Sequence, residues 1–186
     1  GGAAGGCFCE SDAVYDSFDD GDFARHAEGS GCVYDNRTQR NAIRKIKVKH
    51  DGEYLCFLLR TKQPVTPYDG TGSWMRLYLN TTGGQGYQFV LNTHPAPDGT
   101  TTLARVTGTD DDLTAADLPD VAAFYEVDGD KFKIKVPLRA LGLDPDGFTV
   151  WFKAADSREP IASVEDFYDK GDVAPLGRMN FVYRGK

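Results

Sequence analysis

The chain has 186 residues, and 21 Lys and Arg stand against 28 Asp and Glu, so its formal net charge at pH 7 is −7. This length favours one domain with its own apolar core, and 40% hydrophobic and 12% aromatic residues exclude a disordered chain. The negative charge disfavours nucleic acid as a partner, and no segment approaches the roughly 20 apolar residues of a membrane-spanning helix.

The N-terminal segment is unusual in composition. Residues 1–6 carry neither the basic nor the apolar part of a signal peptide. We expect residues 1–21 to be loose or packed on the main domain, which spans residues 22–186. The four cysteines, Cys7, Cys9, Cys32 and Cys56, allow three full pairings, and the strain of joining Cys7 to Cys9 leaves two disulfide frameworks open. Cys56 lies in an apolar strand and is more simply explained as a core residue.

Alternation of apolar and polar residues predicts β-strands along most of the chain. The clearest example is 131–136, where Phe132, Ile134 and Val136 share one face and three lysines share the other. The predicted strands are 43–49, 54–61, 74–80, 87–92, 102–107, 122–127, 131–136, 149–154 and 179–183.

Short connections rich in Gly, Asp and Pro separate these strands, as in 68–72, 95–99 and 144–147. Such connections predict antiparallel pairing. Helical signals are limited to one or two turns at 114–118 and 137–143, too short for crossover helices. The sequence therefore predicts an all-β fold, a two-sheet antiparallel β-sandwich with jelly-roll-like topology.

A candidate ligand face lies on strand 73–80. If Met75, Leu77 and Leu79 face the core, alternation places the intervening residues on the opposite face. Aromatic rings match the apolar face of a sugar, and amide and guanidinium groups bind its hydroxyls. The predicted carbohydrate-binding residues are Trp74, Arg76, Tyr78, Gln88 and Asn92, with Tyr168 and Arg178 from the loop 167–178. The alternative interpretation is that Trp74 belongs to the core.

Catalytic and metal-binding patterns are weak. The three histidines lie outside any known nucleophile or zinc motif. If the chain hydrolysed glycosides with paired carboxylates, Glu165, Asp166 and Asp172 would be the first candidates. Acidic runs at 16–22, 109–112 and 144–147 offer oxygen ligands, and a structural calcium ion is possible among them, although none fits the EF-hand pattern.

Several short motifs, in order along the chain, resemble a carbohydrate-binding module of family 9. They are NAIR (41–44), VKHDGEYL (48–55), Phe57, PVT (64–66), WM (74–75), GYQF (86–89) and GDVAPLGRMN (171–180). The resemblance covers roughly residues 22–183. It implies a β-sandwich appended to a secreted bacterial polysaccharide-active enzyme, with sugar held between two tryptophans and calcium as structural support.

The match to the binding residues of that family is partial. Gln88 and Asn92 correspond to its amide positions, whereas Arg76 replaces a glutamate and Val90 replaces an arginine. Where the family has its second tryptophan, this chain has Phe167 and Tyr168. The specific sugars of the family are therefore not implied.

We expect a non-catalytic module that binds a polysaccharide or oligosaccharide outside the cell, in the periplasm or at the cell surface. Two alternatives stay open. The chain could be a structural module that packs against a catalytic domain of the same parent protein without a ligand of its own, or it could be a glycoside hydrolase.

Overall fold

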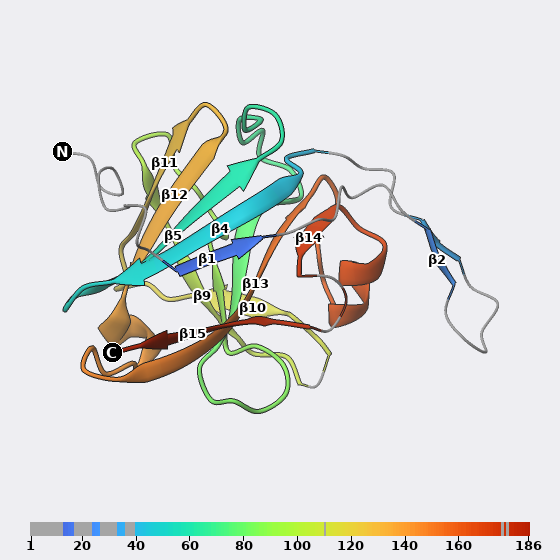
Figure 1. The fold of residues 1–186 in the computed structure, drawn as a ribbon. Helices are drawn as coiled ribbons and strands as arrows, with labels where there is room; N and C mark the ends of the chain where they lie inside the picture. The colour runs from blue at the N-terminus through green and yellow to red at the C-terminus, as the bar shows by residue number, and fades with distance from the viewer. Residues whose placement is uncertain are drawn as a thin grey trace.

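The computed structural model describes the strands at residues 13–16, 24–26 and 33–35, and then residues 40–109, 111–175, 177 and 179–186. Two antiparallel sheets form a sandwich, which confirms the predicted all-β fold. Figure 1 shows β4, β5, β12 and β11 side by side in one layer, with β13 and β15 in the other. None of the helical segments in the described part of the chain is long and apolar enough to span a membrane.

Sheet I contains, in spatial order, β1 (Ala13–Asp16), β4 (Ile43–His50), β5 (Tyr54–Thr61), β12 (Lys131–Pro137), β11 (Ala123–Asp128) and β8 (Thr100–Thr101). Sheet II contains β10 (Ala115–Asp117), β9 (Leu103–Val106), β7 (Phe89–Leu91), β6 (Ser73–Asn80), β13 (Phe148–Ser157) and β14 (Asp172–Ala174), and β15 (Phe181–Gly185) also pairs with β13. A separate pair consists of β2 (Ala24–His26) and β3 (Val33–Asp35).

The main core lies between the two sheets. Strand alternation directs Ile46 and Val48 of β4 inward, and Phe132 and Ile134 of β12 do the same. Phe57 of sheet I meets Phe152 of sheet II edge-on, with ring centroids 5.3 Å apart. This burial of large apolar side chains is the main stabilising term for a domain of this size.

Two local differences separate the structure from the sequence-based expectation, and one local expectation is confirmed. Residues 114–118, expected to be helical, contain strand β10, because Ala115–Asp117 pairs with β9. The expected helical turn after Pro137 is confirmed as the 3-10 helix η1 (Leu138–Leu141), which ends at Gly142 in the left-handed conformation. The expected loop 167–178 contains β14 and follows a second 3-10 helix, η2 (Val164–Tyr168).

The N-terminal part contributes to sheet I. Strand β1, which lies within the segment predicted to be loose or packed, pairs with β4. Cys56 is buried at an outward position of β5, and is not part of the core between the sheets. The pairing of Cys7, Cys9 and Cys32 lies outside the described residues.

Candidate functional site

Strand β6 departs from regular alternation at Met75, and this corrects the expected position of Trp74. Met75 has φ of +44°, so Trp74 and Met75 both join the core between the sheets, and Trp74 is only 2% exposed. The irregularity is held from both sides. Asp156 accepts a hydrogen bond from the Met75 amide at 3.0 Å, and the Asn92 amide donates to the carbonyl oxygens of Trp74 and Met75 at 3.0 and 3.1 Å.

The predicted aromatic and amide face is covered, because sheet II has a second apolar layer on its outer side. Tyr78 is 1% exposed and packs edge-on against Tyr87 and Phe167, with centroid distances of 5.8 and 4.9 Å. Ile161 and Val164, from the segment between β13 and β14, complete this layer. The strand pattern alone showed an open face because the covering segment lies far along the sequence.

Most of the remaining predicted ligand-binding residues make hydrogen bonds within the protein or are partly buried. Asn92 is 1% exposed and its amide holds the irregular part of β6, as described above. Half-buried Arg76 donates to the Thr93 carbonyl oxygen at 3.3 Å, and Gln88 accepts from the Thr81 amide at 2.8 Å. Tyr168 is half-buried at the end of η2, and Arg178 lies outside the described residues. The structure therefore does not bring the predicted set together on one open surface.

An open pocket of about 820 Å³ lies at one end of the sandwich, and Trp74 forms part of its wall. Three aromatic side chains from separate segments meet there: Tyr68 follows β5, Trp74 is the second residue of β6 and Tyr125 lies in β11. The ring centroid of Trp74 is 5.6 Å from that of Tyr68 and 5.7 Å from that of Tyr125. We call this the end pocket. Its lining also includes Val65, Pro67, Pro95, Pro97, Asp98, Gly99, Glu126 and Val127.

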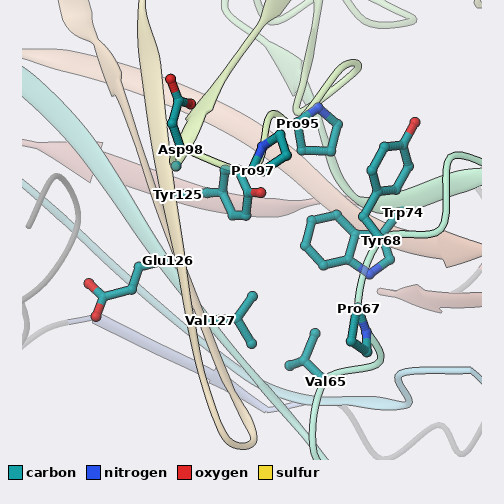
Figure 2. Close-up of a pocket in the computed structure, with 11 residues that line it drawn as sticks. Val65, Pro67, Tyr68, Trp74, Pro95, Pro97, Asp98, Tyr125, Glu126 and Val127 are labelled. Carbon is teal, nitrogen blue, oxygen red and sulfur yellow. The ribbon is translucent and has the colours of Figure 1, made fainter.

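Figure 2 shows how these side chains surround the pocket. Pro95 and Pro97 lie at the top of the view, and Val65 and Val127 lie at the bottom. Tyr125 lies opposite Tyr68 and Trp74, and the carboxylate of Glu126 points away from the three rings. The centre of the pocket is therefore apolar and aromatic, and its charged groups lie at the border.

Hydrogen bonds fix the wall formed by residues 65–68. The Trp74 indole donates to the Thr66 carbonyl oxygen at 2.7 Å, and the Thr66 amide donates to the Asn41 side chain at 2.7 Å. The Val65 amide donates to the Gly129 carbonyl oxygen at 2.8 Å. Trp74 thus has a double function, since it lines the pocket and also holds the loop that carries Tyr68.

The opposite wall, residues 95–99, is fixed by Tyr125. Its hydroxyl donates to the Ala96 carbonyl oxygen at 2.6 Å, and its amide donates to the Gly99 carbonyl oxygen at 2.9 Å. Gly99 has φ of +91°, a conformation that favours glycine. Both sides of the pocket are therefore held in place before any ligand arrives, which lowers the entropic cost of binding.

The pocket carries negative charge at its border and no positive charge among its lining residues. Hydrogen bonds from the Thr100 hydroxyl and amide lower the pKa of Asp98, so its carboxylate is ionised at neutral pH. Burial raises the pKa of the Tyr125 hydroxyl, which stays neutral. Such a site favours neutral or cationic ligands over anionic ones.

Sequence reasoning missed Tyr68, Tyr125 and the prolines as site residues. The turns at 68–72 and 95–99 were visible in the sequence through their Gly and Pro residues. Their meeting with β11 was not visible, because it depends on how the strands are arranged in the sheets.

Two of the three carboxylates considered for hydrolysis accept hydrogen bonds from backbone amides. Asp166 accepts from the amides of Ala162 and Ser163 at 2.7 and 3.0 Å. Asp172 is fully buried and accepts from the Ile43 amide at 2.6 Å. Glu165 is exposed.

The acidic runs that could supply calcium ligands are described only in part. Asp112 and Asp144 each accept hydrogen bonds from residues of their own turns. In the parts of the chain that the structure covers, no three His, Cys, Asp or Glu side chains are grouped so that they could hold a metal ion. The run 16–22 falls largely outside the described residues.

Comparison of the chain with protein-family models, with curated proteins and with solved structures gives no match.

Proposed function

We propose that this domain binds carbohydrate in the end pocket, as a non-catalytic module of a secreted polysaccharide-degrading enzyme. The observation that supports the proposal most is the grouping of Tyr68, Trp74 and Tyr125 around one pocket with fixed walls. Its volume of about 820 Å³ lies in the range of small-molecule sites, which a monosaccharide or disaccharide fits.

The chemistry of the lining matches that of a sugar. The apolar C–H face of a pyranose packs on aromatic rings and proline side chains. The hydroxyls of Tyr68 and Tyr125 and the carboxylates at the border supply polar partners for sugar hydroxyls. Because no Lys, Arg or His lines the pocket, we propose a neutral sugar or an amino sugar as its ligand.

The test is isothermal titration calorimetry with neutral oligosaccharides and chitosan oligomers. Tyr68→Ala removes a half-buried ring from the wall, and we expect it to weaken binding by about threefold to tenfold. Tyr168→Ala is the matched control, because Tyr168 is equally half-buried but lies in η2 and not in the pocket lining. Weaker binding in Tyr168→Ala and unchanged binding in Tyr68→Ala would overturn the proposal.

A second function, docking against a catalytic domain, is favoured by one observation. Val127 is 39% exposed at the edge of the pocket, where Pro67 and Pro97 are also exposed. A partner domain covering this apolar border would bury it. Two results together would favour docking over carbohydrate binding. The folded domain would bind none of the sugars, and it would self-associate, whereas the Val127→Lys variant would be monomeric.

A further inference from the structure

The outer face of sheet I is strongly basic, although the whole chain is acidic. Strands β4 and β12 direct their apolar residues inward and their lysines outward, and β5 lies between them with Arg60 outward. The outward cations are Lys45, Lys47 and Lys49 of β4, Arg60 of β5, and Lys131, Lys133 and Lys135 of β12. We call this surface the basic face.

The strand register places four of these lysines around two uncharged residues. Lys47 and Lys133 lie on either side of Leu58, and Lys49 and Lys135 lie on either side of Cys56. Lysines two residues apart on a strand are about 7 Å apart, and those on β4 and β12 are separated by two strand spacings, about 10 Å. The four positions therefore form a small rectangle of positive charge.

Among the residues that the structure describes, one carboxylate lies directly beside this rectangle. Glu126 of β11 is directly opposite Lys133, whereas Phe124 is opposite Lys135. Other acidic residues lie toward the ends of the strands. Asp130 pairs with Arg60 at 2.9 Å, Asp51 and Glu53 lie in the turn between β4 and β5, and Asp128 and Asp16 are opposite Lys131 and Lys45. Like charges in neighbouring positions of a sheet repel each other and lower the stability of the fold. A bound anion would offset this repulsion between the lysines.

We propose that the basic face binds an acidic polysaccharide, with its carboxylates or sulfates placed over the rectangle formed by Lys47, Lys49, Lys133 and Lys135. The partner follows from charge complementarity and from the flat shape of a sheet surface. This site is separate from the end pocket, whose lining has the opposite charge, and the proposal does not depend on what that pocket binds.

The details of the face favour a polysaccharide over other polyanions. A nucleic acid strand binds through base stacking as well as phosphate contacts. Among the described residues of this face, the aromatic side chains of Tyr54 and Phe124 both lie beneath the ammonium group of Lys135, which is 4.5 and 5.6 Å from their ring centroids. An anionic membrane would gain from protruding apolar groups, but Leu58 and Cys56 are only 7% and 3% exposed.

The experiment measures binding of the full chain to polygalacturonate, with dextran as the neutral comparison. We expect binding to polygalacturonate only, weakened about tenfold or more when NaCl rises from about 50 to about 200 mM. The double variant Lys47→Gln/Lys133→Gln should lose at least about tenfold in affinity. Arg158→Gln/Arg184→Gln is the control, because it removes the same charge from exposed positions outside sheet I and should change affinity less than about twofold.

Circular dichroism of each variant establishes that it is folded. Tyr68→Ala, which changes the end pocket, tests whether polygalacturonate binds at the basic face and not in that pocket. Tyr68→Ala should leave polygalacturonate binding unchanged. Equal loss in both double variants would show a nonspecific charge effect and overturn the proposal, as would absence of binding at low salt. Tighter binding of a single-stranded oligonucleotide than of polygalacturonate would overturn the choice of partner.

Discussion

The indole of Trp74 packs among Tyr68, Tyr125 and Phe132 and donates to the Thr66 carbonyl oxygen, so its loss affects both the core and the end pocket. Trp74→Ala should lower the free energy of unfolding by about 3–5 kcal/mol, because it leaves a large cavity between the sheets. Urea denaturation measures the change.

The second tryptophan provides the comparison for that experiment. Trp151 is half-buried at an outward position of β13, next to the turn at Gly83. We expect Trp151→Ala to cost clearly less than Trp74→Ala. A similar cost for both variants would contradict the central position of Trp74 in the core.

Arg40 and Asp156 form a buried ion pair, with Arg40 Nε 2.8 Å from a carboxylate oxygen and both side chains at most 1% exposed. Asp156→Ala should cost about 3–5 kcal/mol, since it leaves a buried guanidinium without its main acceptor. Asp130→Ala breaks the more exposed pair with Arg60 and should cost less than about 1 kcal/mol. Thermal unfolding of the two variants compares the stability that each ion pair contributes. An equal loss of stability in both variants would show that burial does not determine the contribution of these ion pairs.

At the scale of elements, the irregular part of β6 depends on Asn92 at the end of β7. Asn92 has φ of +76°, and its side chain holds the carbonyl oxygens of Trp74 and Met75. Asn92→Gly removes these hydrogen bonds but accepts the backbone angle, whereas Asn92→Ala loses the bonds and adds backbone strain.

We therefore expect Asn92→Ala to be less stable than Asn92→Gly, by about 1 kcal/mol, in a denaturant titration. Both variants should be less stable than the wild-type domain. Equal stability of the two variants would mean that the positive φ angle contributes no strain at this position.

The elements also show how much of the fold the sequence reveals. Alternation in β4, β5 and β12 predicted three strands, and in β12 it placed three lysines on one face. Prediction failed where distant residues set the local backbone: the angle at Met75 depends on Asn92 and Asp156, and Tyr78 is covered by residues more than 80 positions later. The end pocket could not be predicted, because it needs three segments that meet only once the sheets are formed.

At the scale of the whole molecule, stability should depend on pH through Lys153. This residue is fully buried on the outer side of β13, where its ammonium donates to the Pro175 carbonyl oxygen. Burial lowers its pKa from 10.5 to about 7. Between these pH values the unfolded chain binds more protons than the native state, so the free energy of unfolding rises with pH across this window.

We expect the rise from pH 7 to about pH 10 to be on the order of a few kcal/mol, and to be largely absent in Lys153→Met. Above that range stability should fall again, because burial raises the pKa of Tyr78 and Tyr87. Chemical denaturation at a series of pH values measures both effects. If the free energy of unfolding rises equally steeply with pH in Lys153→Met, groups other than Lys153 cause the rise.

The proposed carbohydrate site of this molecule is the end pocket. The most direct measurement is an NMR titration of the labelled domain with the neutral or amino sugar that binds most tightly, following the amide shifts residue by residue. We expect the largest shifts at residues 65–68, 95–99 and 125–127, around Tyr68 and Tyr125. Shifts concentrated instead at Arg76, Gln88 and Tyr168 would contradict the proposal and place the ligand on the outer side of sheet II.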